Sequence, residues 1–595
     1  MTNYKAPVID QTFVLNELID MKRIAALPGF EEASPDLVDA VLEEAAKFAE
    51  EVLAPLNHVG DHEHSRLEDG KVVVPTGFAE AYQQFVESGW NSISQPTDYD
   101  GQGLPFALQV ICAEMWNAAN MSFALCPMLT ASAIESMYAH ADDNLKQSYL
   151  SKLISGEWTG TMNLTEPQAG SDLAAVRATA VPEDDHYLIT GTKIYITWGD
   201  HEMTDNVIHL VLARLPDAPE GVKGISLFIV PKFILDADGN PDKRNDLKAV
   251  SLEQKLGIHA SPTCVMSFGD EGGAVGYLVG EPHFGLKYMF TMMNHARLEV
   301  GMQGIGVAER AHQKAAEYAL ERVQGHAHGH EGRVQIVHHP DVRRMLMTMR
   351  ALVEASRAVA LVGSAEHDIA HRHPDETQRL VASRRLNLMT PVVKAWSTEI
   401  SQEVVSLGVQ IHGGMGFVEE TGAAQFFRDA RITTIYEGTT GIQANDLIGR
   451  KIIKDQGAAW HELRAELVKF HEQLQAEAGQ DFPIIKSRFE NALGELNTAT
   501  DFVLANAADD PLLAGSASFN YLMLMGTVLG AWLLGRSALI SAEYLKKGEG
   551  DPKFHNNKIA TARFYAEQIL PRTHAYTAGV VAGSTTIMGI DAADL

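Results

Sequence analysis

A block of strand-like segments between residues 160 and 285 interrupts a chain that otherwise carries helical periodicity. The segments are rich in Val, Ile, Thr and Tyr, and Gly, Pro and Asp separate them. They cover residues 187–197, 207–215, 224–233 and 263–270. This pattern predicts a small antiparallel barrel or sandwich of about 120 residues. Because helical patterns flank the block on both sides, we expect an α+β protein that is mostly α, with its sheet inside the sequence.

Apolar residues recur at steps of three and four in the flanking regions. Leu37, Val41, Ala45 and Phe48 show this spacing before the strand block, and small residues from Gly301 onward show it afterwards. Small residues along one helix face let a neighbouring helix approach closely. The predicted parts are an N-terminal extension (1–35), a helical domain (36–158), a middle β domain (159–285), a four-helix bundle (286–455) and an appended C-terminal helical domain (456–595).

Charge and cysteine content exclude several classes of partner. Acidic residues outnumber basic ones 77 to 48, for a net charge of -29, which argues against nucleic acid and anionic membranes. Cys112, Cys126 and Cys264 are too few and too scattered for a disulfide framework or a zinc site, and we expect no metal. The first residues lack the pattern of a secretory signal, so we expect a cytoplasmic protein. The apolar run 521–535 is short and interrupted by glycine, which favours a buried helix over a membrane span.

Two stretches around the strand block could bind a ligand. In the first, Leu164, Thr165 and Ser171 surround a Gly-Ser turn, although Ser171 or a neighbour could simply cap a helix. In the second, Tyr195 precedes Thr197 at a strand end, and aromatic surface beside a hydroxyl suits a planar heteroaromatic ring. Aromatic core packing is the alternative for the second stretch.

Three further stretches lie in the later helical region. Gly413 and Gly414 leave backbone amides open to a phosphate, but they follow a predicted helix, so a helix C-cap is the alternative and a Rossmann motif is not supported. Glu437 precedes small residues and a predicted helix, where a carboxylate could merely favour the helix dipole. The histidine-rich stretch 325–340 could bind a metal, but its flexible Gly spacers favour a solvated loop.

The order of these motifs resembles the acyl-CoA dehydrogenase family of FAD-dependent flavoproteins. The resemblance is carried by TEPQAGSD (165–172), YIT (195–197), NHARLEVGMQGIGVAERA (294–311), YALER (318–322), QIHGGMGF (410–417) and IYEGTTGIQ (435–443). It implies a helical domain, a middle β-barrel and a four-helix bundle, with FAD between the barrel and the bundle. The C-terminal helical domain is then an addition to this fold.

The resemblance also implies roles for individual residues toward FAD. Leu164, Thr165 and Ser171 would touch the flavin and its ribityl chain, and Thr197 would bind the ring edge near N5. Tyr195 stands where most members have Trp. The pyrophosphate and adenine of a neighbouring subunit's FAD would contact a further set: Arg322, Gln410, Gly413 and Gly414. Thr439 and Gly441 would meet the adenine end of FAD.

The implied reaction is α,β-dehydrogenation of an acyl-CoA to its 2,3-enoyl form, an oxidation at a CH–CH bond. Glu437 would be the base that removes the α-proton, and Ser171, Arg297 and Gly438 would contact the substrate. The Glu437 backbone N–H and a ribityl hydroxyl would bind the thioester oxygen. We expect drying of the pocket by the ligand to make the Glu437 carboxylate a stronger base.

Substrate and partners follow from the same resemblance. The length and EGTTGIQANDLIGRK (437–451) resemble members that oxidise 3-(methylthio)propanoyl-CoA in dimethylsulfoniopropionate breakdown. A fatty acyl-CoA dehydrogenase of β-oxidation and an acyl-CoA oxidase remain alternatives, and a DNA-binding flavoprotein is a remote one. We expect electron-transfer flavoprotein as the partner and a homodimer as the assembly. Acyl-chain length should depend on helix positions in 106–130 and 286–300.

Overall fold

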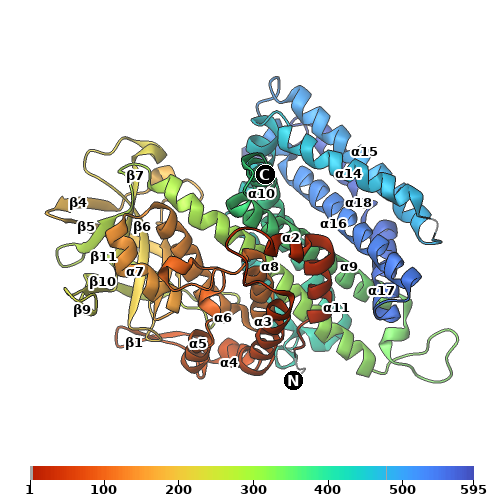
Figure 1. The fold of residues 1–595 in the computed structure, drawn as a ribbon, viewed down its shortest axis with the longest axis horizontal. Coiled ribbons are helices and arrows are strands. Elements are labelled where there is room, and N and C mark those ends of the chain that lie inside the picture. The colour runs from red at the N-terminus through yellow and green to blue at the C-terminus, as the bar shows by residue number, and fades with distance from the viewer. Residues whose placement is uncertain (1–3, 478) are drawn as a thin grey trace. The chain divides into compact units, whose positions relative to one another are not determined.

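The computed structural model describes residues 4–477 and 479–595 (Figure 1). The chain divides into two compact units. One comprises residues 44–299 and is called the barrel unit here. The other comprises residues 1–43 and 300–595 and is called the bundle unit. The mostly helical α+β fold expected from the sequence is confirmed.

The barrel unit contains the sheet. Its strands are β3 (Trp158–Asn163), β4 (Thr179–Glu183), β5 (His186–Thr197), β6 (Asn206–Arg214), β7 (Ile225–Pro231), β10 (Leu247–Leu252), β11 (Thr263–Phe268) and β12 (Ala274–Leu278). Two short hairpins accompany it: β1 (Arg66–Glu68) with β2 (Lys71–Val73), and β8 (Phe233–Leu235) with β9 (Pro241–Arg244). β7 is buried along its whole length and β6 along almost all of it, so both are central strands with apolar contacts on both faces.

The sheet closes into a small barrel through β4. The main strand order is β10-β11-β5-β12-β7-β6-β3, and β4 pairs with both β5 and β6. Strands β5, β12, β7, β6 and β4 therefore form a closed ring, which removes open edges there. The expectation of a purely antiparallel sheet is wrong, because β3 runs parallel to β6. Two further strands separate β3 from β6 in sequence, and this long connection permits the parallel pairing.

Four helices complete the barrel unit: α4 (Ala54–Glu63), α5 (Phe78–Glu87), α6 (Phe106–His140) and α7 (Asp143–Ser155). Both α6 and α7 contact β3. The helix α6 is kinked at Asn120, whose backbone is non-helical with φ -160° and ψ 89°. The Asn120 side chain accepts a hydrogen bond from the backbone N–H of Phe123 and so starts the second half of the helix.

The bundle unit is built on long helices. They are α8 (Gly285–Glu321, belonging to this unit from Val300), α9 (Pro340–Arg372), α10 (Glu376–Pro391), α11 (Ser397–His412), α12 (Ala423–Ala430) and α13 (Thr440–Asn445). A π-helical turn over Val392–Trp396 joins α10 to α11, so the two form one continuous rod. Such turns in long helices are often found at functional sites. Another π-helical segment, Asp446–Ile453, continues α13.

The appended helices belong to the bundle unit. They are α14 (Ala458–Ala476), α15 (Phe482–Asn506), α16 (Leu513–Lys547), α17 (Pro552–Phe564) and α18 (Arg572–Val581). The helix α16 contacts α9, α15, α17 and α18 and lies among them in Figure 1. Among the described residues, α16 alone has the length and apolar composition of a membrane span. However, 83% of its most apolar window is buried in the protein.

The N-terminal segment joins the same unit through ion pairs. It forms α1 (Val8–Phe13), a π-helical segment (Val14–Ile19), α2 (Met21–Ala25) and the start of α3 (Pro35–Phe48). The Asp10 carboxylate accepts from Arg357 on α9 at 2.7 Å and from Lys558 on α17. Arg357 also binds Glu309 at 2.7 Å, and Lys558 also binds Glu354 at 2.9 Å. This network, called the Asp10 network below, connects the first helix of the chain to α8, α9 and α17.

Candidate functional site

The segment that carries Glu437 has an unusual backbone. Both Glu437 and Gly438 adopt left-handed conformations, with φ of 54° and 87°. A non-glycine residue in this region costs free energy and persists only where its surroundings enforce it. Thr439 caps α13, since its hydroxyl accepts from the backbone N–H of Ile442 at 3.2 Å. Glu437 thus lies just outside a helix N-terminus, as the sequence predicts.

Two buried side chains donate hydrogen bonds to the backbone carbonyls of this segment. The fully buried ammonium of Lys394 donates to the carbonyl of Gly438 at 2.6 Å. The amide of Gln443 donates to the carbonyl of Glu437 at 3.2 Å. A Cβ at Gly438 would come 2.5 Å from Gln443 Nε2, the end of a flexible side chain, so the left-handed φ is what favours glycine here.

Hydrogen bonds also fix the positions of Tyr436 and Thr440, which lie on either side of this segment. The hydroxyl of Tyr436 donates to Gln303 Oε1 on α8, and burial raises the pKa of Tyr436 well above its usual value. The hydroxyl of Thr440 donates to Glu399 Oε1 on α11 at 2.5 Å. The half-buried Glu437 side chain therefore projects from a segment tied to three helices.

Sequence reasoning missed Lys394, Gln443 and Tyr436 as parts of this site. A signal for Lys394 was present, because it is a lone cation in the apolar run TPVVKAW (390–396) and a buried lysine needs a partner. Nothing local in the sequence pairs it with Gly438, which lies 44 residues further on.

The predicted flavin residues Leu164, Thr165, Tyr195 and Thr197 lie on β5 and on the loop beside it. The backbone N–H of Ile194 donates to the carbonyl of Thr165 at 2.9 Å, which places the 164–166 loop beside β5. Tyr195 has a left-handed backbone, with φ 60°, at a bulge in the pairing of β5 with β11, and Thr197 ends the strand. Tyr195 is 60% exposed and Thr197 is half-buried.

A buried ion pair links β5 to the 164–166 loop. Lys193 Nζ lies 2.8 Å from Glu166 Oε1 and donates to the carbonyl of Leu164 at 3.0 Å. Burial opposes the charge on Glu166, but Lys193 and two backbone N–H groups outweigh it and lower the pKa of Glu166. Burial lowers the pKa of Lys193 to about 8. Leu164 itself is buried.

The structure also contains the helix caps and the aromatic core packing that the sequence offered as alternatives to ligand binding. Asp172 caps a short 3-10 helix through the N–H of Ala174, while Ser171 is exposed. Trp198 is a core residue, 1% exposed, and its indole donates to the carbonyl of Ser122. Gly413 is the C-cap of α11, with φ 60°.

The residues predicted to hold the FAD of a neighbouring subunit lie at one end of the bundle unit. Arg322 and Gln410 are exposed, and Tyr318 stacks on His412 at 4.5 Å, which brings the end of α8 beside the end of α11. A Cβ at Gly413 or Gly414 would meet nothing within 4 Å, so their backbone is open to a ligand. Gly441 has similar space, its nearest neighbour being Thr439 Oγ1 at 3.8 Å.

Arg297, predicted to contact CoA, is a buried residue of the barrel unit. It is 6% exposed, donates to Asn294 Oδ1 at 3.3 Å, and its guanidinium lies 5.9 Å from the centre of the Phe290 ring.

The donor set fits a flavin dinucleotide. The barrel unit offers a half-exposed hydroxyl beside an exposed aromatic ring, which suits a planar ring system. The bundle unit offers open glycine amides and an exposed arginine, which suit phosphates.

Comparison with known proteins agrees with this chemistry. Four acyl-CoA dehydrogenase family models match the chain: the N-terminal domain (36–157), the middle domain (161–270), the C-terminal domain (283–452) and an acetyl-CoA dehydrogenase C-terminal-like region (463–591). The chain belongs to the acyl-CoA dehydrogenase family. It is an oxidoreductase of acyl-CoA thioesters that uses FAD.

Individual relatives cover almost the whole chain. The 3-methylmercaptopropionyl-CoA dehydrogenase of Ruegeria pomeroyi is 49% identical over 95% of this chain and 96% of its own. A butyryl-CoA dehydrogenase of Syntrophomonas wolfei is 32% identical over 96% of this chain and 95% of its own. The crystal structure of Caenorhabditis elegans ACDH-11 with C11-CoA shares the fold, with a TM-score of 0.77 at 22% identity over 96% of this chain and 92% of that chain.

Proposed function

We propose that this protein oxidises 3-(methylthio)propanoyl-CoA to 3-(methylthio)acryloyl-CoA, with Glu437 as the base. The 49% identity to the Ruegeria enzyme over nearly the full length of both chains carries the substrate assignment. The anchored, left-handed Glu437 carries the assignment of the base.

The proposed reaction breaks two C–H bonds. The Glu437 carboxylate takes the α-proton and becomes a carboxylic acid. The β-hydrogen would leave as hydride, for which bound FAD would supply the acceptor. The backbone N–H of Glu437 binds the thioester oxygen and stabilises the enolate-like charge that develops there.

The proposed cofactor contacts follow the exposed surfaces described above. Leu164, Thr165, Ser171, Tyr195 and Thr197 would hold the flavin and its ribityl chain. The pyrophosphate and adenine of a neighbouring subunit's FAD would contact four residues: Arg322, Gln410, Gly413 and Gly414. Thr439 and Gly441 would meet the adenine end of FAD. Ser171, Arg297 and Gly438 would contact the substrate, and the Arg297 side chain is buried.

The Glu437→Gln variant tests the assignment of the base. It should retain FAD and bind the thioester, but lose turnover by about 10³-fold or more, because the amide cannot accept the α-proton. Stopped-flow reduction of the flavin measures this step directly. Reduction at the wild-type rate would reject Glu437 as the base.

The substrate is tested with a panel of acyl-CoA thioesters that includes butyryl-CoA. The relative in Syntrophomonas wolfei makes a short-chain fatty acyl-CoA the second candidate. The highest kcat/KM should belong to the methylthio thioester. Peroxide release in place of dye-linked reduction would instead support an acyl-CoA oxidase.

The proposed partners are electron-transfer flavoprotein and a second copy of the chain, in the cytoplasm. Exposed apolar side chains lie near the proposed FAD phosphate residues: Leu320 (61%), Val323 (47%), Met415 (49%) and Phe417 (88%). Such a patch is typical of a subunit interface. Phe417→Asp should convert the homodimer to monomers in light scattering and weaken FAD binding, whereas an unchanged mass would reject this surface.

A further inference from the structure

Three hydrogen bonds from β5 hold the loop that follows β3. Lys193 Nζ donates to the carbonyl of Leu164 at 3.0 Å and to Glu166 Oε1 at 2.8 Å. The backbone N–H of Ile194 donates to the carbonyl of Thr165 at 2.9 Å. Two consecutive carbonyls and one carboxylate of this loop are therefore bound by two consecutive residues of β5.

A β-bulge in β5 provides one of these donors. The pairing of β5 with β11 shifts between Lys193 and Ile196, where two residues of β5 lie opposite one residue of β11. The extra residue of a bulge loses its partner in the ladder, and bulges are frequent beside active sites. Here the N–H of Ile194 binds the loop, and Tyr195 adopts its left-handed φ of 60°.

The Glu166 carboxylate connects the loop to the segment that precedes β4. Its Oε1 also accepts from the backbone N–H of Ala178 at 3.0 Å. Its Oε2 accepts from the backbone N–H of Arg177 at 2.8 Å and from Gln168 Nε2 at 2.6 Å. Glu166 is 4% exposed and Lys193 is 0% exposed. Removal of either charge would thus leave the other buried without its counter-charge.

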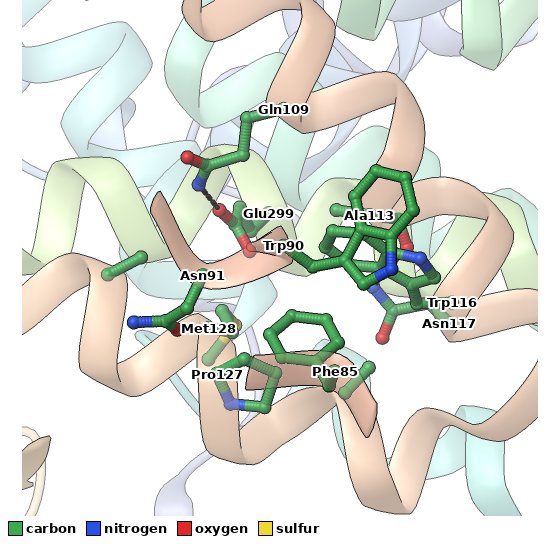
Figure 2. Close-up of a pocket in the computed structure, with 12 residues that line it drawn as sticks. Phe85, Trp90, Asn91, Gln109, Ala113, Trp116, Asn117, Pro127, Met128 and Glu299 are labelled. Atoms are coloured by element: carbon green, nitrogen blue, oxygen red, sulfur yellow. Dashed lines mark hydrogen bonds between the residues drawn. The ribbon is translucent and has the colours of Figure 1, made fainter. Parts of the chain in front are cut away.

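Glu299 shows what burial does to a carboxyl group that has no lysine beside it. It lies at a small cavity of the barrel unit and accepts from Gln109 Nε2 at 2.8 Å (Figure 2). Burial raises the pKa of Glu299 to about 7. Burial acts on Glu166 as well, yet Lys193 and two backbone N–H groups outweigh it and lower the pKa of Glu166. Lys193 therefore helps to keep Glu166 ionised within the loop.

We propose that Lys193 is a positioning residue for FAD, because it fixes the loop that carries Thr165. This inference rests on the proposed function, in which Leu164 and Thr165 contact the flavin. Lys193 is fully buried, so it acts on the cofactor through the loop. A loop that is already fixed loses little conformational freedom when a ligand binds, and this makes binding tighter.

Lys193→Met tests the inference in the full-length holoenzyme. The variant loses the donor to the Leu164 carbonyl, so the Kd for FAD should rise about tenfold, as expected for one or two lost hydrogen bonds. It also leaves Glu166 charged and buried, so the protein should unfold at a lower denaturant concentration. The fluorescence of FAD released on dilution gives the Kd, and chemical denaturation gives the stability.

Lys193→Met combined with Glu166→Gln separates positioning from stability, and serves alone if Lys193→Met does not fold. The glutamine keeps an acceptor oxygen for the backbone N–H groups but carries no charge, so stability should return toward the wild-type value. The Kd for FAD should stay about tenfold higher than in the wild type, because the Leu164 carbonyl still lacks its donor. A wild-type Kd in either variant would overturn the inference and leave the proposed function intact.

Gln109→Leu is the matched control, because it removes the neutral donor to the other buried carboxyl group, Glu299. It should lower the stability of the protein and leave the Kd for FAD unchanged. A tenfold rise in this variant as well would overturn the inference, since FAD affinity would then follow stability alone. A wild-type protein that binds no FAD would overturn both the inference and the proposed function.

Discussion

Trp396 occupies the space beside Gly526. A Cβ built on Gly526 would come 2.2 Å from Cγ of the Trp396 indole. Trp396 ends the π-helical turn between α10 and α11, and Gly526 lies in the buried part of α16. The appended helices therefore pack directly on the rod that also carries Lys394.

Gly526→Ala should destabilise the protein by about 3 kcal/mol, because the methyl group would overpack this contact. Gly515→Ala is the control, since it lies in the same helix with nothing within 4 Å of its Cβ. It should be neutral or slightly stabilising, as expected for alanine in a helix. Chemical denaturation of both variants measures the difference, and equal stabilities would contradict the packing described here.

Lys394→Met should lower kcat about 10–100-fold while FAD content stays at the wild-type level. Lys394 touches no reacting atom and acts by holding the Gly438 carbonyl, so its loss would displace Glu437. A merely structural role would lower stability without changing the ratio of kcat to KM. Lys394→Arg, which can still donate, should recover part of kcat.

Asp10→Asn should destabilise the protein by about 3 kcal/mol, because it leaves Arg357 and Lys558 buried with less compensating charge. Burial opposes the charge on Asp10, but Lys558 and Arg357 outweigh it and lower the pKa of Asp10 to about 2. A carboxyl with a lowered pKa contributes stability above about pH 4, and that contribution is lost as pH falls toward 2. Denaturation between pH 2 and pH 6 should show a smaller loss for the variant than for the wild type.

The stability of the wild type should contain an opposite contribution from Glu299. Its pKa is raised from 4.5 to about 7, so the folded state holds a proton that the unfolded state releases. The contribution is complete below about pH 4.5 and decreases as pH rises toward 7, by about 3 kcal/mol at most. Glu299→Gln should remove this decrease. Identical pH profiles for variant and wild type would show that Glu299 is ordinarily ionised.

The strands predicted from composition alone match β5, β6, β7 and β11 within two residues at each end. The others were missed for local reasons. Pro182 interrupts β4, Gly276 interrupts β12, and β3 carries two polar Thr residues that are buried in the fold. The barrel closes through β4, which the sequence did not predict. A β domain could therefore be predicted, but the order of its strands could not.

The candidate site, too, could be predicted only in part. Glu437 and the glycines could be found from the sequence because their spacing is local. The left-handed Glu437 and its support by Lys394 depend on contacts between distant parts of the chain. Glu299 illustrates a further limit, since an acid between Leu298 and Val300 in a helix gives no sign of which residue will face it.

The Asp10 network also bears on how the protein is made. Every residue of the barrel unit has left the ribosome once residue 299 and a short stretch beyond it have been synthesised, so that unit can form while translation continues. Asp10 must wait for Lys558, 548 positions later. The first described helix to emerge is thus among the last to gain all its ion pairs, and a nascent chain that stalls before α17 would leave Asp10 with Arg357 but without Lys558.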